Sequence, residues 1–275
     1  MTTYQFMRIV EIRTKIVSVS AYVIGSLYAA VMLESWNWAR AGVLFLAVLA
    51  VDMGTTAFNT FFDYYRGVDR KERNREADKV LVHEGVAPLA ALLVASVLFL
   101  IAVFLGLVLA VQMTIAFGVD ESILLLALGA MSIAVGFLYN AGPLPISSTP
   151  VGELFAGGFL GGLLVLLTVF VQHGTFSGAT WWLAVPSTAF VAGILTVNNT
   201  CDIEGDRASG RRTLSIIVGR TGGELLVYLL GIVGYGSVIW LSYRGVLPWI
   251  TIWSAAAAAV DRKSTRLNSS HTHLS

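Results

Sequence analysis

Two short segments of this sequence combine carboxylate and amide side chains at a spacing suited to metal chemistry. The first contains Asn59 and Asp63, and the second contains Asn198, Asp202 and Asp206. Residues four apart share one face of an α-helix, so each segment is predicted to present a short ladder of oxygen ligands. Such ligands suit Mg²⁺, which binds few carboxylates together with waters and substrate phosphates. We therefore expect the remaining ligands to come from a phosphorylated substrate.

Basic residues follow both acidic segments. Lys79 follows the first, and Arg207, Arg211 and Arg212 follow the second. Their side chains are of the type that pairs with phosphate oxygens, so we predict that they neutralise a diphosphate. The alternative is that these are ordinary interfacial loops whose basic residues reflect only topology. The two matched acidic ladders favour the phosphate site.

Three further polar residues are placed where they could line the same site. Asp52 precedes Asn59 by seven residues and lies within an apolar segment, where an ionisable side chain needs a cavity or a partner. Tyr139 ends another apolar segment just before Gly142, and a terminal tyrosine is either a site residue or an interfacial anchor. Glu153 lies just inside the next apolar segment, so it either belongs to the site or pairs with a neighbouring helix.

The elements that must position these residues are membrane-spanning helices. The chain is 56% hydrophobic and 13% charged, with a mean hydropathy of +0.75, which is too apolar for a soluble domain. Its apolar runs reach the roughly 17 to 25 residues that cross a bilayer, and backbone groups in lipid require helices. The predicted spans are 16–33, 41–61, 88–112, 123–139, 151–171, 181–198, 222–243 and 247–260.

The acidic segments close the second and the sixth of these spans, so the same motif recurs after four spans. The predicted fold class is therefore an all-α, polytopic transmembrane helical bundle made of two four-helix halves. Internal repeats of this kind often place a binding site at the interface between the halves.

The distribution of Lys and Arg predicts the orientation in the membrane. Six basic residues lie in 66–79 and four in 207–220, whereas the loops 117–122 and 172–179 contain none. By the positive-inside rule, the N-terminus and both acidic segments are predicted to face the cytoplasm. The membrane predicted to hold the chain is the cytoplasmic (inner) membrane. Cys201 is the single cysteine, which excludes an internal disulfide, and no signal peptide is expected. The net charge of +1 gives no basis for a nucleic-acid partner, and none is expected.

Residues 261–275 differ from the rest of the chain because they are polar and lack helical periodicity. They resemble translated adapter sequence joined to a truncated reading frame. We therefore expect residues 1–260 to form the membrane domain and 261–275 to be a non-native disordered tail. The alternative is a disordered tail that belongs to the protein.

Together these motifs resemble the UbiA superfamily of intramembrane prenyltransferases, and within it the 1,4-dihydroxy-2-naphthoate branch of menaquinone biosynthesis. The resemblance covers roughly residues 8 to 260. Since the family is built from about nine helices, about eight of the expected nine spans are present. The motifs that carry the resemblance are Asn59-x-x-x-Asp63-Tyr64-Tyr65, Gly142-Pro143 followed by Gly152-Glu153, and Asn198-Asn199-x-x-Asp202-x-x-x-Asp206-x-x-x-Gly210-Arg211-Arg212-Thr213-Leu214.

The resemblance implies magnesium-dependent transfer of a polyprenyl group from polyprenyl diphosphate to an aromatic acceptor. Two Mg²⁺ ions are expected, one held by Asp63 with Asp69 and the other by Asp202 with Asp206. Asp69 departs from the family pattern, which carries its second carboxylate three or four residues after the first. It can reach the metal only if the helix ends near Gly67 and the loop folds back.

The resemblance also implies roles for neighbouring side chains. The side-chain amides expected to orient metal-bound waters or phosphate oxygens are those of Asn59, Asn198 and Asn199. Aromatic rings are expected to shelter an allylic carbocation by cation–π attraction, with ordinary packing as the alternative, and these are Tyr64, Tyr65 and Tyr139. In the naphthoate reaction the acceptor loses its carboxylate, and the prenyl tail extends into lipid.

Two alternatives stay open. Another acceptor, such as 4-hydroxybenzoate, homogentisate or a glycerol phosphate, would use the same motifs. An ion-coupled secondary transporter would also carry intramembrane acids, but near the midplane of the bilayer. Acidic ladders at helix ends beside basic loops favour capture of a phosphate.

Overall fold

The computed structural model describes residues 1–68, 79–142 and 144–254. Asp69, the last six residues of the predicted eighth span (255–260) and the whole predicted tail lie outside these ranges. Every regular element within them is helical, which confirms the predicted all-α fold class.

Seven helical segments in the described ranges are long and apolar enough to cross a membrane. Shorter helices flank them: α1 (Thr3–Ile9), α4 (Val80–His83), η2 (Ile146–Ser148), α10 (Ile203–Ala208) and η4 (Trp249–Ile252). The seven spans are η1 (Ile12–Lys15) continued by α2 (Ile16–Val31), α3 (Trp38–Tyr65), α5 (Pro88–Ala116), α6 (Val119–Asn140), α7 (Gly152–Ala156) continued by η3 (Gly157–Leu163) and α8 (Leu164–His173), α9 (Gly178–Cys201), and α11 (Leu214–Tyr243).

The first half of the chain contains four spans, as predicted, and the described part of the second half contains three. The described part of the predicted eighth span, 247–254, contains the short helix η4. The span predicted to begin at residue 222 begins instead at Leu214. It is interrupted at Gly219, whose φ of 74° is available to glycine without steric cost and accounts for the misplaced boundary.

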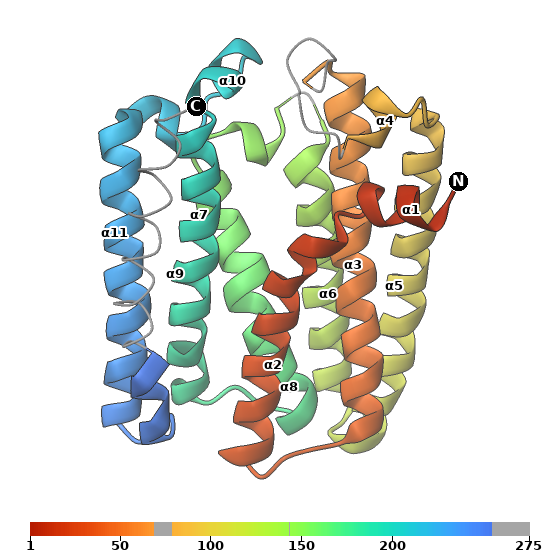
Figure 1. The fold of residues 1–275 in the computed structure, drawn as a ribbon. Coiled ribbons are helices and arrows are strands. Elements are labelled where there is room, and N and C mark those ends of the chain that lie inside the picture. The colour runs from red at the N-terminus through yellow and green to blue at the C-terminus, as the bar shows by residue number, and fades with distance from the viewer. Residues whose placement is uncertain (69–78, 143, 255–275) are drawn as a thin grey trace.

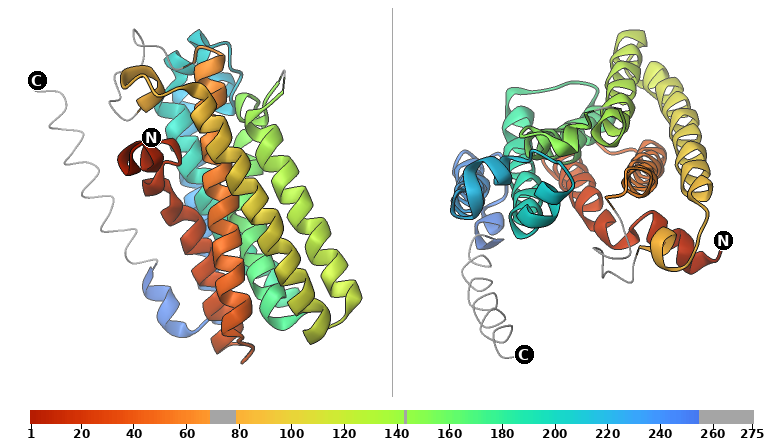
Figure 2. Two further views of the ribbon diagram at one scale, coloured as in Figure 1. Left: turned by 90° about the vertical axis from the view of Figure 1, so that its right-hand side faces the viewer. Right: turned by 90° about the horizontal axis from the view of Figure 1, so that it is seen from above.

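The spans run side by side, and Figure 1 shows α10 and α4 at the same end of the bundle. In the first half α3 packs on α5 and α6, and in the second half α9 packs on α11. Contact between α2 and α8 joins the halves. There a Cβ added at Gly25 would lie 2.7 Å from the Thr168 Cβ, so glycine permits this close approach. Figure 2 shows the bundle from the side and along its axis.

The fifth span changes helix type along its length. It begins as α7, widens into the π-helix η3, and continues as α8. Glycine is required in η3 because the backbone of α9 passes very close. A Cβ at Gly157 would lie 2.6 Å from the Thr188 carbonyl oxygen, and one at Gly161 would lie 2.6 Å from the Ser187 carbonyl oxygen. This packing positions α7, which carries Glu153, against α9.

Candidate active site

One guanidinium group connects the two acidic motifs. Asp63 at the end of α3 is 7% exposed, and Asp206 in α10 is 4% exposed. The Arg211 Nη2 lies 3.3 Å from the Asp63 Oδ1, and its Nη1 lies 3.1 Å from the Asp206 Oδ1. The fold therefore brings together carboxylates from the two halves of the chain, as the repeated motif predicts.

The second motif does not form a ladder on one continuous helix, and that prediction is wrong. Helix α9 ends at Cys201, and Asp202 has φ −108° and ψ 24°, which separates α9 from α10. Asn198 and Asp202 are exposed, whereas Asp206 is buried. The Asp202 carboxylate folds against Gly205, where an added Cβ would overlap it. The helix break therefore turns Asp202 and Asp206 into different environments.

Glu153 and Asn199 form a buried pair beside the acidic residues. The Asn199 Nδ2 donates a hydrogen bond to the Glu153 Oε1 at 2.8 Å, and Glu153 is 3% exposed. Glu153 also interacts electrostatically with Asp206 and Tyr139. Both alternatives that the sequence left open for Glu153 therefore apply, because it pairs with a neighbouring helix and also borders the site.

The acidic end has the donor atoms that a hard cation needs. The Asp206 Oδ2 and the Glu153 Oε2 are buried and have no hydrogen-bond partner among the described residues. Unpartnered buried carboxylate oxygens are costly, and a divalent cation would relieve that cost. Within the described ranges no three acidic, histidine or cysteine side chains gather closely enough to hold a metal by themselves.

The electrostatics of Asp206 reflect its burial. Burial raises the pKa of the Asp206 carboxyl above its ordinary value, and Asp202 and Glu153 raise it further. The Arg211 guanidinium acts in the opposite direction, by its charge and by its hydrogen bond. Burial is the largest of these effects, so the ionised form of Asp206 lacks full compensation from the surrounding protein.

The other predicted basic residues have different surroundings. Lys79 pairs with Glu11, the two charged atoms being 3.6 Å apart. Arg207 and Arg212 are exposed, and the Arg212 backbone N–H donates to the Ser148 carbonyl at 2.9 Å. Of the three arginines predicted after the second motif, Arg211 is the one that contacts the acidic residues.

The predicted aromatic and amide residues divide between the site and the surface. Tyr65 is 78% exposed and stacks on Phe61, and Tyr64 is also exposed. Neither lines the cavity described below, whereas Tyr139 does. Asn59 lies one turn before Asp63 and is half-buried.

A cavity of about 570 Å³ lies between α3, α5, α6 and the fifth span. Its walls are formed mainly by Leu, Ile, Val, Ala, Gly and Phe. Asp52 lines it, as predicted, and so do Thr55 and Tyr139. Tyr139 also interacts electrostatically with Arg211, so the cavity adjoins the acidic end of the bundle.

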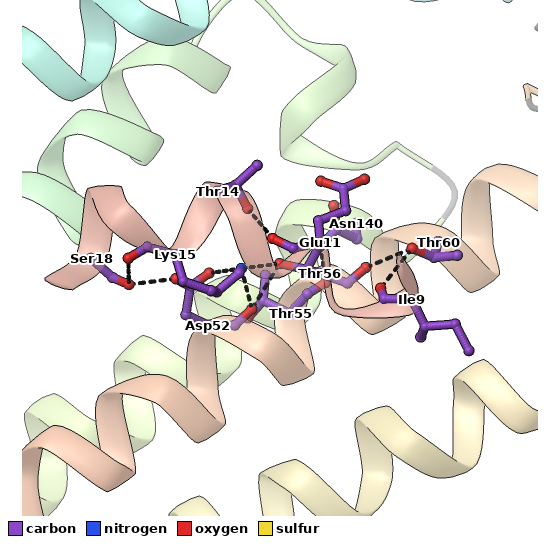
Figure 3. A network of polar contacts seen from close by, with 10 residues as sticks. All are labelled: Ile9, Glu11, Thr14, Lys15, Ser18, Asp52, Thr55, Thr56, Thr60 and Asn140. Carbon is purple, nitrogen blue, oxygen red and sulfur yellow. Dashed lines mark hydrogen bonds and ion pairs between the residues drawn. The ribbon is translucent and has the colours of Figure 1, made fainter. Parts of the chain in front are cut away.

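Asp52 has a partner that the sequence reasoning missed. The Lys15 Nζ lies 2.5 Å from the Asp52 Oδ1 and donates to the Thr56 Oγ1 at 2.6 Å. The Ser18 Oγ donates to the Asp52 Oδ2 at 2.5 Å, and Figure 3 shows this network. Lys15, at the start of the first span, is not among the site residues that the sequence predicts. The signal for its role was the need of Asp52 for a counter-charge within an apolar segment.

These features define the class of protein: an all-α, multi-pass membrane protein with one buried carboxylate from each half of the chain, Asp63 at the end of α3 and Asp206 in α10. Residues 18–261 match the model of the UbiA prenyltransferase family. The chain belongs to this family.

Individual relatives agree with this assignment. Over 215 residues the chain is 33% identical to 1,4-dihydroxy-2-naphthoate octaprenyltransferase of Bacillus subtilis, covering 76% of this chain and 66% of that protein. It therefore spans slightly less than two thirds of that relative's length.

Solved structures show the same fold. The apo structure of a UbiA homolog from Aeropyrum pernix superposes with a TM-score of 0.69 at 18% identity, covering 90% of this chain and 85% of that one. A UbiA homolog from Archaeoglobus fulgidus, solved bound to DMAPP and Mg²⁺, superposes with a TM-score of 0.67 at 13% identity, covering 94% and 87%.

Proposed function

We propose that this protein transfers a polyprenyl group from polyprenyl diphosphate to an aromatic acceptor within the membrane. The observation that carries the proposal is the pair of buried carboxylates, Asp63 and Asp206, joined by Arg211 beside an apolar cavity. A diphosphate needs cations at one end and its prenyl chain needs an apolar surface at the other. The site offers both within one bundle.

The metal ligands proposed are Asp63 with Asp69 and Asp202 with Asp206, for two Mg²⁺ ions. Support comes from the unpartnered oxygens of Asp206 and Glu153 and from the Archaeoglobus fulgidus homolog, whose structure contains Mg²⁺. When bound, Mg²⁺ would neutralise the diphosphate and stabilise it as a leaving group. Asp69 lies outside the described residues and enters through the family motif alone.

The chain's own residues then have distinct tasks. Arg211 would contact the diphosphate from the protein side, while Asn59 and Asn199 orient the groups around it. As the bond between the prenyl carbon and the diphosphate oxygen breaks, the diphosphate leaves with the electron pair. The ring carbon of the acceptor supplies the electrons of the new carbon–carbon bond. Tyr139, on the cavity wall, presents a ring face to the allylic cation.

The acceptor proposed is 1,4-dihydroxy-2-naphthoate, which would lose its carboxylate as carbon dioxide and restore the aromatic ring. The support is the 33% identity to the Bacillus subtilis enzyme named for this acceptor. This assignment places the protein in menaquinone biosynthesis. Prenylation of 4-hydroxybenzoate or another acceptor is the alternative, while family membership argues against the ion-coupled transporter.

The proposed location is the cytoplasmic (inner) membrane, with the N-terminus and the acidic end of the bundle facing the cytoplasm. The support is the excess of Lys and Arg near that end. A water-soluble acceptor and released diphosphate would then exchange with the cytoplasm, while the prenyl chain stays in lipid.

The test is a reconstituted transfer assay. Purified protein in lipid vesicles is given labelled polyprenyl diphosphate, Mg²⁺ and, separately, each of several aromatic acceptors, and products are identified by mass. The expected product is a prenylated naphthalenediol lacking the carboxylate, and chelation of the divalent cation should abolish it. Turnover that is undiminished in excess chelator would contradict the metal assignment. A product formed only from 4-hydroxybenzoate would contradict the acceptor.

A further inference from the structure

The cavity wall carries a charge that prenyl-chain binding does not require. The polar side chains among its described lining residues are Asp52, Thr55, Ser132 and Tyr139. Asp52 is ionisable, and its counter-charge comes from Lys15, which is only 4% exposed. Buried charges in a membrane protein are costly and commonly mark a ligand site. A wall that served only an isoprenoid chain would be more stable without this pair.

The hydrogen bonds of Asp52 leave each of its two carboxylate oxygens able to accept one more. Lys15 donates to its Oδ1 and Ser18 donates to its Oδ2. Each carboxylate oxygen can accept two hydrogen bonds, and an ionised carboxylate accepts only. A ligand group that meets Asp52 in the cavity must therefore be a donor, such as a hydroxyl. A ligand carboxylate would be repelled.

The position of Asp52 relative to the acidic end suits the ring of an acceptor. Asp52 and Asp63 lie on the same continuous helix, α3. Eleven residues at 1.5 Å per residue separate them by about 16 Å along the helix axis. A diphosphate held near Asp63, its reacting carbon and one aromatic ring would fill a gap of this size. The far side of that ring would then face Asp52.

We propose that Asp52, held in place by Lys15 and Ser18, binds a ring hydroxyl of the aromatic acceptor. The inference rests on the proposed function, because it assigns the Asp52 end of the cavity to the acceptor. Lys15 does not line the cavity, so it is a positioning residue that acts through the carboxylate. The pair selects acceptors whose prenylated ring carries a hydroxyl that is not adjacent to the ring carboxylate.

The test measures equilibrium binding of two probes to the full chain: 4-hydroxy-2-naphthoate, whose hydroxyl is not adjacent to the carboxylate, and 2-naphthoate, which lacks the hydroxyl. The variant Lys15→Met with Asp52→Leu removes both charges together, so that no unpaired charge is left buried. A second variant, Lys15→Met with Asp52→Asn, keeps an oxygen that can accept a hydrogen bond. The matched control is Arg220→Gln with Glu224→Gln, which removes an exposed ion pair on α11. Thermal unfolding in detergent verifies that each variant is folded.

Wild type and control should bind the hydroxylated probe more tightly by about tenfold to hundredfold. The Met/Leu variant should lose that preference while binding 2-naphthoate as wild type does, and the Met/Asn variant should fall between them. Equal binding of both probes by wild type, or an unchanged preference in the Met/Leu variant, would overturn the inference. Because binding is read without turnover, this result is separate from the transfer assay, where failure would contradict the proposed function instead.

Discussion

The ends of α3 and α9 carry the same Asn-x-x-x-Asp spacing but present it differently. Helix α3 continues without a break through Asn59 and Asp63 to Tyr65. Helix α9 stops at Cys201, and the chain turns at Asp202 into the short helix α10. Each end nevertheless contributes one buried carboxylate to the same guanidinium. The comparison indicates that the site needs one buried carboxylate from each helix end. A continuous helix and a broken helix can both place that carboxylate beside Arg211.

The largest effect is expected from replacing the two buried carboxylates, Asp63 and Asp206. Asp63→Asn and Asp206→Asn should each lower prenyl transfer by about a hundredfold or more, since each removes a buried charge that holds the cation. Asp202→Asn should cost less, because Asp202 is exposed and packs on Gly205. Steady-state rates at saturating Mg²⁺ measure this order. If Asp202→Asn lost as much activity as the other two, the comparison based on burial would be wrong.

The next largest effect is expected from replacing Arg211, which bridges Asp63 and Asp206. Arg211→Gln leaves Asp63 and Asp206 as buried carboxylates without their shared cation, so the metal-free protein should be destabilised. Mg²⁺ should then raise the melting temperature of this variant more than that of wild type. Arg211→Lys keeps the charge but not the forked geometry and should fall between them. Equal Mg²⁺-induced shifts in all three proteins would indicate that the guanidinium and the metal act at separate places.

The buried carboxylate of α10 also predicts a pH dependence. Because burial raises the pKa of Asp206 in the folded state, the folded protein binds this proton more tightly than the unfolded chain does. The contribution of Asp206 to the free energy of unfolding should therefore fall as pH rises from the ordinary aspartate pKa through the raised one. Melting temperatures of wild type and Asp206→Asn, measured without divalent cations, should diverge in the variant's favour over that interval. A difference that is independent of pH would contradict this.

A smaller effect is expected from changing the turn at Asp202, which separates α9 from α10. Gly205→Ala would place a Cβ against the Asp202 carboxylate, so that side chain must move. We expect a several-fold loss of activity with little loss of folding, since α10 is short and lies at the surface. Arg244→Gln, at the other end of α11, is the control and should change neither rate nor stability. An equal loss in both variants would mean that the assay reports general damage.

The large features of this molecule could be predicted from the sequence because each depends on a local pattern. Long apolar runs predict spans, and the Asn-x-x-x-Asp spacing predicts which helix ends carry the site. The break at Asp202 was missed because the residues around it continue the helical spacing. The break brings the Asp202 carboxylate against Gly205, a contact that the spacing alone does not indicate.

Partnerships between distant residues were harder to predict than positions along the chain. Arg211 was expected to contact phosphate, but its contact with both Asp63 and Asp206 depends on the packing of one half of the bundle against the other. Lys15 was not predicted as a site residue, because nothing local in the sequence connects it to Asp52. Tyr64 and Tyr65 follow Asp63 directly in the sequence, yet the rotation of α3 turns them outward. Family motifs identify such neighbours without indicating which way they face.

The π-helix η3 has a consequence for the angular register of the fifth span. A π-helical segment holds more residues in the same axial length than an α-helix, so it shifts the rotation of everything before it relative to everything after it. If the seven residues of Gly157–Leu163 were all α-helical instead, α7 would be rotated relative to α8, because an α-helix turns by about 100° per residue and the wider π-helix turns by less. Glu153 would then point away from Asn199, while the apolar face of α8 stayed in place. The π-helix thus sets the rotation of α7 relative to α8, so that α8 can pack in the bundle while the Glu153 carboxylate faces Asn199.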